Sequence, residues 1–161
     1  MEDTWNTEMD ELVKQYRDSL FASAFSVCRN ASDAEDVVQD TFLTFYLRRA
    51  KFESEEHKKA WLLRVAINKA KNVRRTFWWR NRVSYEEYME SMTFETPESA
   101  ELFEDVMKLP EKYRIVIHLF YYEDYSVKEI AQILNVSEGS VKMRLSRGRA
   151  MLRVKLEGAT I

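Results

Sequence analysis

Glycine and proline are scarce in this sequence, and it contains no long uninterrupted apolar run. Of its 161 residues, three are glycine and two are proline, whereas average usage would give roughly eleven and eight. Both residues interrupt helices, so we predict an all-α fold. No stretch of 18 apolar residues is present and the first residues are acidic, so neither a membrane-spanning helix nor a signal peptide is expected. We expect a soluble, cytoplasmic protein.

The residue types that build disulfides, metal sites and cofactor sites are also few. Cys28 is the single cysteine, which excludes an internal disulfide, and its apolar neighbours at helical spacing predict a core position. His57 and His118 have no partner at metal-ligand spacing. The glycines are too sparse for a phosphate-binding loop, and no nucleophile stands beside a base. We therefore predict no metal, no cofactor and no catalytic activity.

Charge is unevenly distributed along the chain, although the formal net charge is only −2. Residues 57–82 carry nine basic and no acidic side chains, and residues 141–161 carry six basic and one acidic. Between them, residues 83–105 carry eight acidic and no basic side chains. Two separated basic segments are typical of a protein that meets a polyphosphate twice. Charge alone is equally compatible with two solvated helix faces.

Apolar periodicity predicts three helices in the first half of the chain. Residues 8–28 place an apolar side chain at every third or fourth position. Ser32 and Glu35 have the spacing of a capping box, which predicts that a second helix begins there. After a charged loop at 51–59, a third helix is predicted over 60–77, with one apolar and one cationic face.

The second half is predicted to be a separate helical domain. Residues 78–96 lack a clear period and are interpreted as a flexible acidic linker between domains of residues 1–77 and 97–161. Thr96 is predicted to cap the first helix of the second domain, and Pro110 to begin another. The predicted core positions of that helix are Tyr113, Val116, Ile117 and Phe120.

Residues 126–156 have the pattern of a helix-turn-helix. Ser126 and Glu129 form a second capping-box pair, Asn135 suits the positive φ of a tight turn, and Ser137 can cap the next helix. That helix is predicted to bury Val141, Leu145 and Leu152, and to expose Lys142, Ser146, Arg147 and Arg149. The same spacing occurs in plain helical bundles, but the lack of acidic residues in the body of this helix favours DNA binding.

Several segments resemble the extracytoplasmic-function (group IV) sigma factors of the sigma-70 superfamily, the bacterial initiation subunits of RNA polymerase. Residues 33–42 resemble the region 2 helix that docks on the clamp coiled coil, and 61–72 the helix that meets the minus-10 element. Residues 109–131 and 141–149 resemble region 4, whose recognition helix reads the minus-35 element. The resemblance extends over about residues 8–156. It implies a region 2 domain followed by a helix-turn-helix region 4 domain.

The resemblance also implies three sets of site residues. The contacts to core polymerase would be Asp36, Gln39 and Asp40. The minus-10 contacts would be Phe52, Arg64, Asn68, Lys71, Asn72 and Arg75. The minus-35 contacts would be Ser137, Ser140, Lys142, Met143, Arg144, Ser146, Arg147 and Arg149.

Phe52 would receive an unstacked base in the loop before the minus-10 helix, whereas Trp61, Trp78 and Trp79 are expected to pack. The implied partners are promoter DNA, core RNA polymerase through its clamp coiled coil and flap tip, and an anti-sigma factor, often anchored at the membrane. The acidic linker would either run through polymerase, mimicking the transcript, or act as a tether.

Three residues depart from the pattern of that family. Met143 stands where a small polar residue is common, which bears on base preference. Gly148 stands where alanine is common. Glycine destabilises a helix by about 1 kcal/mol relative to alanine, a cost that is offset if Gly148 permits close approach of another backbone. Asn135 stands where glycine is often found.

The main hypothesis is therefore a bacterial alternative sigma factor that directs promoter-specific initiation. A stand-alone helix-turn-helix transcriptional regulator is a second hypothesis, but it assigns no role to the basic residues of 57–82. A third hypothesis is a helical adaptor that binds only proteins, and it predicts no sensitivity to salt.

Overall fold

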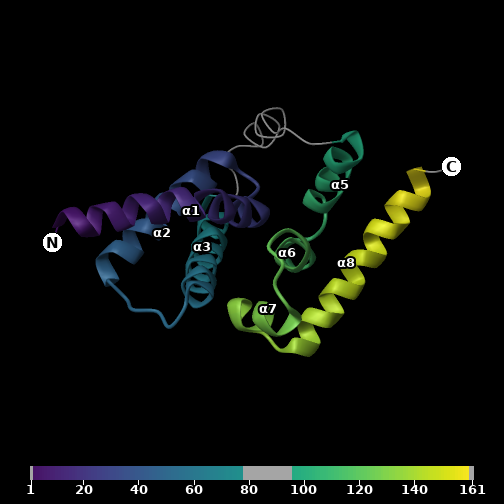
Figure 1. The fold of residues 1–161 in the computed structure, drawn as a ribbon. Helices are drawn as coiled ribbons and strands as arrows, with labels where there is room; N and C mark the ends of the chain where they lie inside the picture. The colour runs from purple at the N-terminus through teal and green to yellow at the C-terminus, as the bar shows by residue number, and fades with distance from the viewer. Residues whose placement is uncertain (1, 78–95, 160–161) are drawn as a thin grey trace. The chain divides into compact units, whose positions relative to one another are not determined.

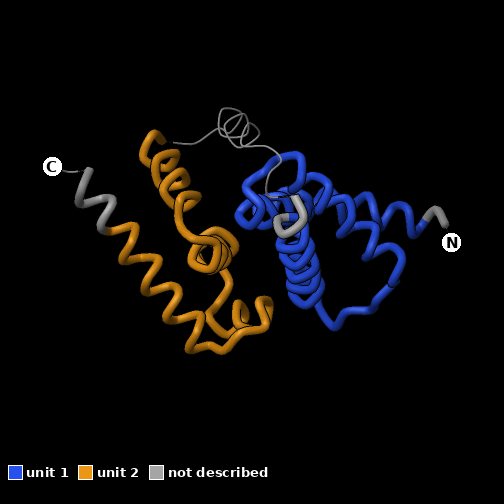
Figure 2. The backbone as a smooth tube through the Cα atoms, turned by 180° about the vertical axis from the view of Figure 1, so that it is seen from behind, with its two compact units in different colours: residues 1–85 blue, residues 86–161 orange. Residues whose placement is uncertain are grey.

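The computed structural model describes the backbone of residues 2–77 and 96–159 and the side chains of residues 4–73 and 96–153. Within these residues the chain is helical and contains no β-strand, which confirms the predicted all-α fold. The chain divides into two compact units, residues 1–85 and 86–161 (Figure 2). The predicted linker, 78–96, lies almost wholly outside the described residues.

Unit 1 is a bundle of three helices that pack against one another in every pairing (Figure 1). These are α1 (Glu2–Cys28), α2 (Ala31–Arg48) and α3 (Glu55–Phe77). Their shared core is fully removed from solvent because each helix has apolar residues three or four positions apart. The largest buried side chains of this core are Leu20, Phe25, Leu62, Leu63 and Ile67.

Two helix starts in unit 1 differ from the sequence prediction. Asn30, not Ser32, caps α2, because its side chain accepts a hydrogen bond from the Asp33 amide at 2.9 Å. The helix α3 begins at Glu55 rather than near residue 60, since the Ser54 hydroxyl accepts from the His57 amide at 3.1 Å. Both starts use a short polar side chain to satisfy a free amide of the first turn.

Unit 2 contains four α-helices and one π-helical turn among its described residues. They are α5 (Pro97–Met107), α6 (Glu111–Ile117), the π-turn η1 (His118–Tyr122), α7 (Val127–Leu134) and α8 (Glu138–Ala159). Thr96 caps α5 as predicted, accepting from the Ser99 amide at 3.1 Å.

The turn between α5 and α6 is held by a buried cation. Arg114 is 4% exposed, and its Nη1 donates to the carbonyls of Met107 and Leu109 at 3.2 and 3.0 Å. These carbonyls lie at the C-terminal end of α5, where main-chain acceptors lack helical partners and a cation is favourable. Arg114 therefore fixes the direction in which α6 leaves α5.

Three apolar side chains lie nearer the surface than their periodicity predicted. Phe120 and Leu152 are half-buried, and so is Cys28 at the end of α1. Cys28 lies next to the left-handed residue Arg29, and its thiol contacts the Asn30 carbonyl at 3.5 Å. The prediction of a core position for Cys28 was therefore wrong: the residues of the last turn before it are buried, but Cys28 itself, where α1 ends, is partly exposed.

Candidate nucleic-acid and polymerase interfaces

The helix-turn-helix of unit 2 is built by local hydrogen bonds at each helix end. The Ser126 hydroxyl accepts from the Glu129 amide, and the Glu129 carboxylate accepts from the Ser126 amide, both at 3.1 Å. Asn135 takes the left-handed conformation with φ 55° and ends α7. Ser137 then caps α8 by accepting from the Ser140 amide at 3.0 Å. The predicted capping box, turn residue and second cap are all confirmed.

Close packing fixes α8 against the rest of unit 2. Val141 and Leu145 are 0% and 2% exposed. A Cβ atom at Gly148 would lie 3.2 Å from Ile117 Cγ1 and 3.5 Å from Tyr113 Cβ, so α8 passes directly over α6 at this glycine. The predicted close backbone approach is confirmed, and it explains why a helix tolerates glycine here.

Most of the predicted minus-35 residues share the side of α8 that faces away from this packing. Lys142, Met143, Ser146 and Arg147 are exposed, as is the cap residue Ser137, while Ser140 and Arg144 are half-buried. Arg147 also hydrogen-bonds the Tyr113 hydroxyl, and together with the nearby Lys112 this holds the pKa of Tyr113 below its usual value. The same contact restrains the Arg147 side chain at the edge of the exposed side.

The structure does not bring Arg149 together with this set. Its Nε donates to the Tyr121 hydroxyl at 2.6 Å, and its guanidinium carbon lies 5.4 Å from the centre of the Phe120 ring. Cation–π contact of this kind holds Arg149 over η1. Arg149 therefore lies beside a groove, about two turns along α8 from Lys142.

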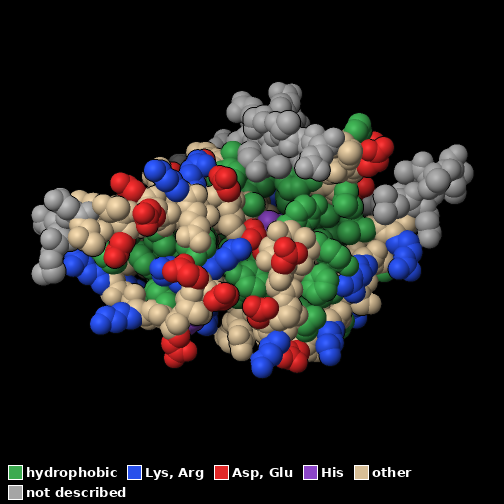
Figure 3. Space-filling view, viewed as in Figure 1, with side chains coloured by type: hydrophobic (Ala, Val, Ile, Leu, Met, Phe, Trp, Pro, Cys, Tyr) green, Lys and Arg blue, Asp and Glu red, His purple; other side chains and the backbone are tan. Residues whose placement is uncertain are grey.

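That groove has a volume of about 550 Å³ and lies between α5, η1 and α8. Its lining is mainly apolar but includes two cations of α8, Arg149 and Arg153. Figure 3 shows hydrophobic side chains gathered on this face of unit 2, over α5 and α6. The groove is lined by Ser99, Leu102, Val106, Ile117, Tyr121, Tyr122, Arg149, Leu152 and Arg153.

In unit 1, the predicted minus-10 residues line the outer face of α3. Arg64 and Asn68 are exposed and Lys71 is half-buried, on the side opposite the buried residues Leu63 and Ala66. Asn72 is exposed at the border of this face. The side chain of Arg75 lies outside the described residues.

An aromatic cluster adjoins this face at the N-terminal end of α3. The Phe52 ring centre lies 6.0 Å from that of Phe45, 5.5 Å from that of Trp61 and 5.4 Å from that of His57. Phe52 and Trp61 are both half-buried, so each presents part of its ring to solvent. Trp61 packs against Phe45 and Phe52, as expected, and it also lies one turn before Arg64, on the same side of α3.

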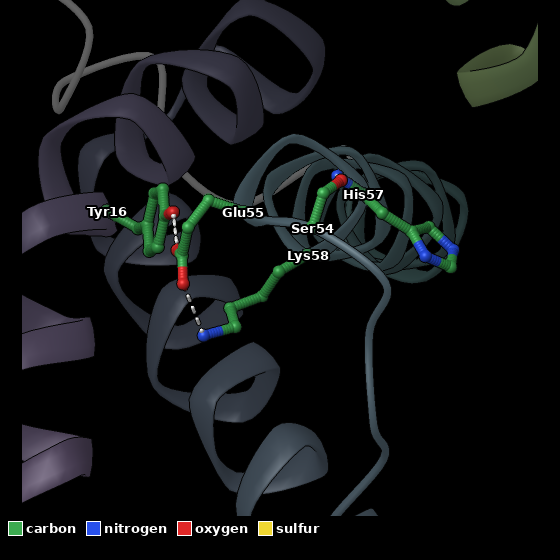
Figure 4. Close-up of polar contacts among 5 residues, drawn as sticks. All are labelled: Tyr16, Ser54, Glu55, His57 and Lys58. Atoms are coloured by element: carbon green, nitrogen blue, oxygen red, sulfur yellow. Dashed lines mark hydrogen bonds and ion pairs between the residues drawn. The ribbon is translucent and has the colours of Figure 1, made fainter.

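A hydrogen-bonded latch ties the beginning of α3 to α1 (Figure 4). The Tyr16 hydroxyl donates to Glu55 Oε2 at 2.8 Å, and Lys58 Nζ lies 3.1 Å from Glu55 Oε1. Burial, and then the hydrogen bond to Glu55, raise the pKa of Tyr16 to about 12. The hydrogen bonds from Tyr16 and Lys58 lower the pKa of Glu55. This latch fixes the end of the loop that carries Phe52, and the sequence analysis did not anticipate it.

The predicted polymerase-binding residues Asp36, Gln39 and Asp40 are exposed on one face of α2. Asp40 pairs with Lys69 of α3 at 2.7 Å. Asp36, Asp40, Lys69 and Asn72 line one cavity of about 370 Å³, so Asn72 also adjoins this acidic face.

The same face of α2 continues into exposed apolar side chains that the sequence analysis missed. Leu43 and Leu47 are 53% and 70% exposed, and Tyr46 is 36% exposed. Leu43 and Leu47 follow Asp36 and Asp40 at helical spacing, which was the available signal. Exposed leucines on successive turns of one helix are typical of a surface that a protein partner covers.

These features occur together in known proteins. Residues 12–80 match the Sigma-70 region 2 family and residues 106–152 match Sigma-70, region 4. The chain is 36% identical over 157 residues to the RNA polymerase sigma-E factor of Streptomyces coelicolor, covering 92% of this chain and 86% of that protein. This chain belongs to the extracytoplasmic-function sigma factors.

Further relatives and solved structures match this chain across both of its units. The ECF RNA polymerase sigma factor SigW of Bacillus subtilis is 28% identical over 163 residues, covering 91% of this chain and 87% of that one. The structure of CnrH in complex with the cytosolic domain of CnrY matches with a TM-score of 0.69 and 27% identity, over 95% and 90% of the two chains. The sigma factor RpoE of Bartonella quintana, in complex with the anti-sigma factor NepR, matches with a TM-score of 0.74 and 22% identity, over 93% and 97%.

As a sigma factor, the chain binds core RNA polymerase and directs transcription initiation at specific promoters. The alternative of a stand-alone regulator is not favoured, because region 2 accompanies the helix-turn-helix. Sigma factors are DNA-binding initiation factors, not catalysts. No helix in the described parts of the sigma factor combines the length and apolar character needed to cross a membrane.

Proposed function

We propose that this sigma factor is a group IV member that divides promoter recognition between its two units, with domains over residues 1–77 and 97–161. The observation that supports this most directly is that each unit exposes a helix face with cationic and hydrogen-bonding side chains opposite its core. In unit 1 this is the face of α3 that bears Arg64 and Asn68, and in unit 2 it is the face of α8 that bears Lys142 and Arg147. Cations displace counterions from phosphates, and the polar groups among them can reach bases.

Unit 1 is proposed to open and hold the minus-10 element. Unpaired bases stack on aromatic rings, and their phosphates require nearby cations. The half-buried rings of Phe52 and Trp61 lie next to Arg64 and Asn68, so one strand could be held by both kinds of group. Lys71, Asn72 and Arg75 would continue the contacts to that strand along α3.

Unit 2 is proposed to read the minus-35 element with α8. Ser137, Ser140, Lys142, Met143, Arg144, Ser146 and Arg147 would meet the DNA. Arg149 is the exception among the residues expected there, because it is engaged over η1. We assign it to the rim of the groove instead, which is proposed to receive the polymerase flap tip.

The outer face of α2 is proposed to bind the clamp coiled coil. Asp36, Gln39 and Asp40 would supply the polar contacts, and Leu43 and Leu47 would supply buried apolar area.

Binding of an anti-sigma factor is proposed as well, since the similar RpoE structure holds the anti-sigma factor NepR and the similar CnrH structure holds the cytosolic domain of CnrY. We further propose that the chain acts in the cytoplasm and has no catalytic activity of its own.

Run-off transcription with core polymerase and a promoter library tests the whole assignment. The expected result is initiation at defined positions, downstream of one common pair of sequence elements. Initiation without such elements would contradict it.

A charge placed on the apolar part of α2 tests the polymerase contact. Leu47→Glu should weaken binding to core polymerase by at least tenfold, because a carboxylate would be desolvated at the interface. Asn6→Glu adds the same charge at an exposed position of α1 and should leave binding unchanged. Equal affinity of both variants would exclude this face of α2.

A further inference from the structure

One apolar side chain stands in the middle of the solvent-facing side of α8. Successive residues of an α-helix are offset by about 100° around its axis, so Met143 is offset by about 200° from both Val141 and Leu145. Val141 and Leu145 bury α8 against unit 2 and are 0% and 2% exposed, whereas Met143 is 45% exposed. The Met143 side chain therefore projects away from the packed side.

Three small residues lie beside Met143 on this side. Gly139, Ser146 and Ala150 lie four, three and seven residues from it, and all three are exposed. Small side chains allow a helix backbone to come close to a base-pair surface, which brings that surface within reach of the Met143 side chain. Two exposed cations lie on either side of Met143: Arg147 one turn farther along α8, and Lys142 directly before Met143 in the sequence.

Met143 is also separate from the groove beside η1. The α8 residues that line the groove are Arg149, Leu152 and Arg153. Arg149 lies about 120° around the helix from Met143. A partner in the groove would therefore leave Met143 uncovered.

The chemistry of the methionine side chain restricts what it can recognise. It has no proton to donate and its thioether is a weak acceptor, so it cannot read the hydrogen-bonding groups that distinguish most bases. The one apolar group that a base pair shows in the major groove is the C5-methyl of thymine. We propose that Met143 contacts a thymine methyl group in the upstream element and thereby selects thymine at one position. This inference rests on the proposed function, in which α8 enters the major groove there.

Replacement of thymine by deoxyuridine removes only this methyl group and tests the contact. A promoter is first selected by the holoenzyme from a library randomised over the upstream element. Each thymine of that element is then replaced singly, on either strand, and holoenzyme binding is measured. We expect deoxyuridine at one position to weaken binding about fourfold, the change that corresponds to one buried methyl group.

Two variants separate this contact from general loss of affinity. Holoenzyme with Met143→Ala should bind thymine and deoxyuridine equally at the sensitive position. Holoenzyme with Lys142→Ala should bind both templates more weakly but keep the fourfold difference, because a phosphate contact does not sense the methyl group.

Three results would overturn the inference: a selected upstream element without thymine, equal binding of all deoxyuridine templates by the wild type, or an unchanged fourfold difference with Met143→Ala. A different result is expected if α8 does not bind the upstream element at all. In that case selection yields no upstream element, and Lys142→Ala and Arg147→Ala leave promoter binding unchanged.

Discussion

Single side chains in this sigma factor depend on neighbours that are distant in sequence. Tyr16 and Glu55 are the clearest pair, because their hydrogen bond joins α1 to the first residue of α3. Tyr16 is one of the residues that form the apolar spacing of residues 8–28, and it is 4% exposed. The identity of its partner could not be predicted, since Glu55 is one of three acidic residues, with Glu53 and Glu56, around the start of α3.

The raised pKa of Tyr16 predicts a loss of stability in alkali. In the unfolded chain a tyrosine ionises near pH 10, whereas in unit 1 the pKa of Tyr16 is about 12. The unfolded state therefore releases its proton first, so this stability is complete below about pH 10 and is lost as pH rises toward about 12. The free energy of unfolding in urea, measured across this range, should fall less steeply for Tyr16→Phe than for the wild type.

Glu55→Gln provides the comparison for that experiment. It removes the negative charge but leaves Tyr16 buried, so it should reduce the alkaline loss only in part. Identical pH profiles for the wild type and Tyr16→Phe would show that the latch does not contribute.

Two glycines of α8 are predicted to respond in opposite ways to larger side chains. A Cβ at Gly148 would lie only 3.2 Å from Ile117 Cγ1, so Gly148→Leu should force α8 from α6 and destabilise unit 2 by about 1–3 kcal/mol. A Cβ at Gly139 would meet only Ser137 Oγ, at 4.0 Å. Gly139→Ala should therefore be neutral or stabilising by up to about 1 kcal/mol. Thermal unfolding of the two variants decides this, and equal destabilisation would be inconsistent with the packing described.

At the scale of elements, the helix ends carry most of the difference between prediction and structure. The ends of α7 and the start of α8 were predicted residue by residue, because their capping side chains act on amides only three residues away. The starts of α2 and α3 were not. Asn30 lies close to Ser32 and Asp33, which could also cap a helix, and packing of the bundle decides which one is used. The start of α3 was missed because the charged residues that follow Ser54 lack an apolar period.

The turn between α7 and α8 depends on the left-handed conformation of Asn135. Asn135→Gly should keep the stability of unit 2 within about 1 kcal/mol, because glycine adopts this conformation without strain. Asn135→Val should destabilise the unit by about 1–2 kcal/mol, since a β-branched residue clashes there. Chemical denaturation measures both, and upstream-element binding should fall only with the valine variant. A valine variant as stable as wild type would refute the role of the turn.

At the scale of the whole molecule, the two units are predicted to act at different steps of initiation. Arg147→Ala should weaken upstream-element binding by about 1–3 kcal/mol if its contact is bidentate. It should also reduce the slope of log affinity against log salt by about one if the contact is to phosphate.

Asn68→Ala should impair formation of the open complex more than closed binding. Gel shifts and permanganate footprinting separate these steps, and equal losses in both steps for Asn68→Ala would argue against a role on melted DNA.

The sequence by itself determined the helical class, the division into two units and most of the exposed faces. These follow from the scarcity of helix breakers, from the three-to-four-residue spacing of apolar side chains and from the change of charge along the chain, all of which act over a few residues. Val141 and Leu145 were thus assigned to the core, and Lys142 and Arg147 to the surface.

Only the tertiary structure decided where side chains meet across helices. It placed Arg149 against η1, brought Phe52 against Trp61 and formed the groove beside α5. Each of these depends on how one helix is rotated against another, and that rotation is set by the combined packing of the whole core, which no local spacing encodes.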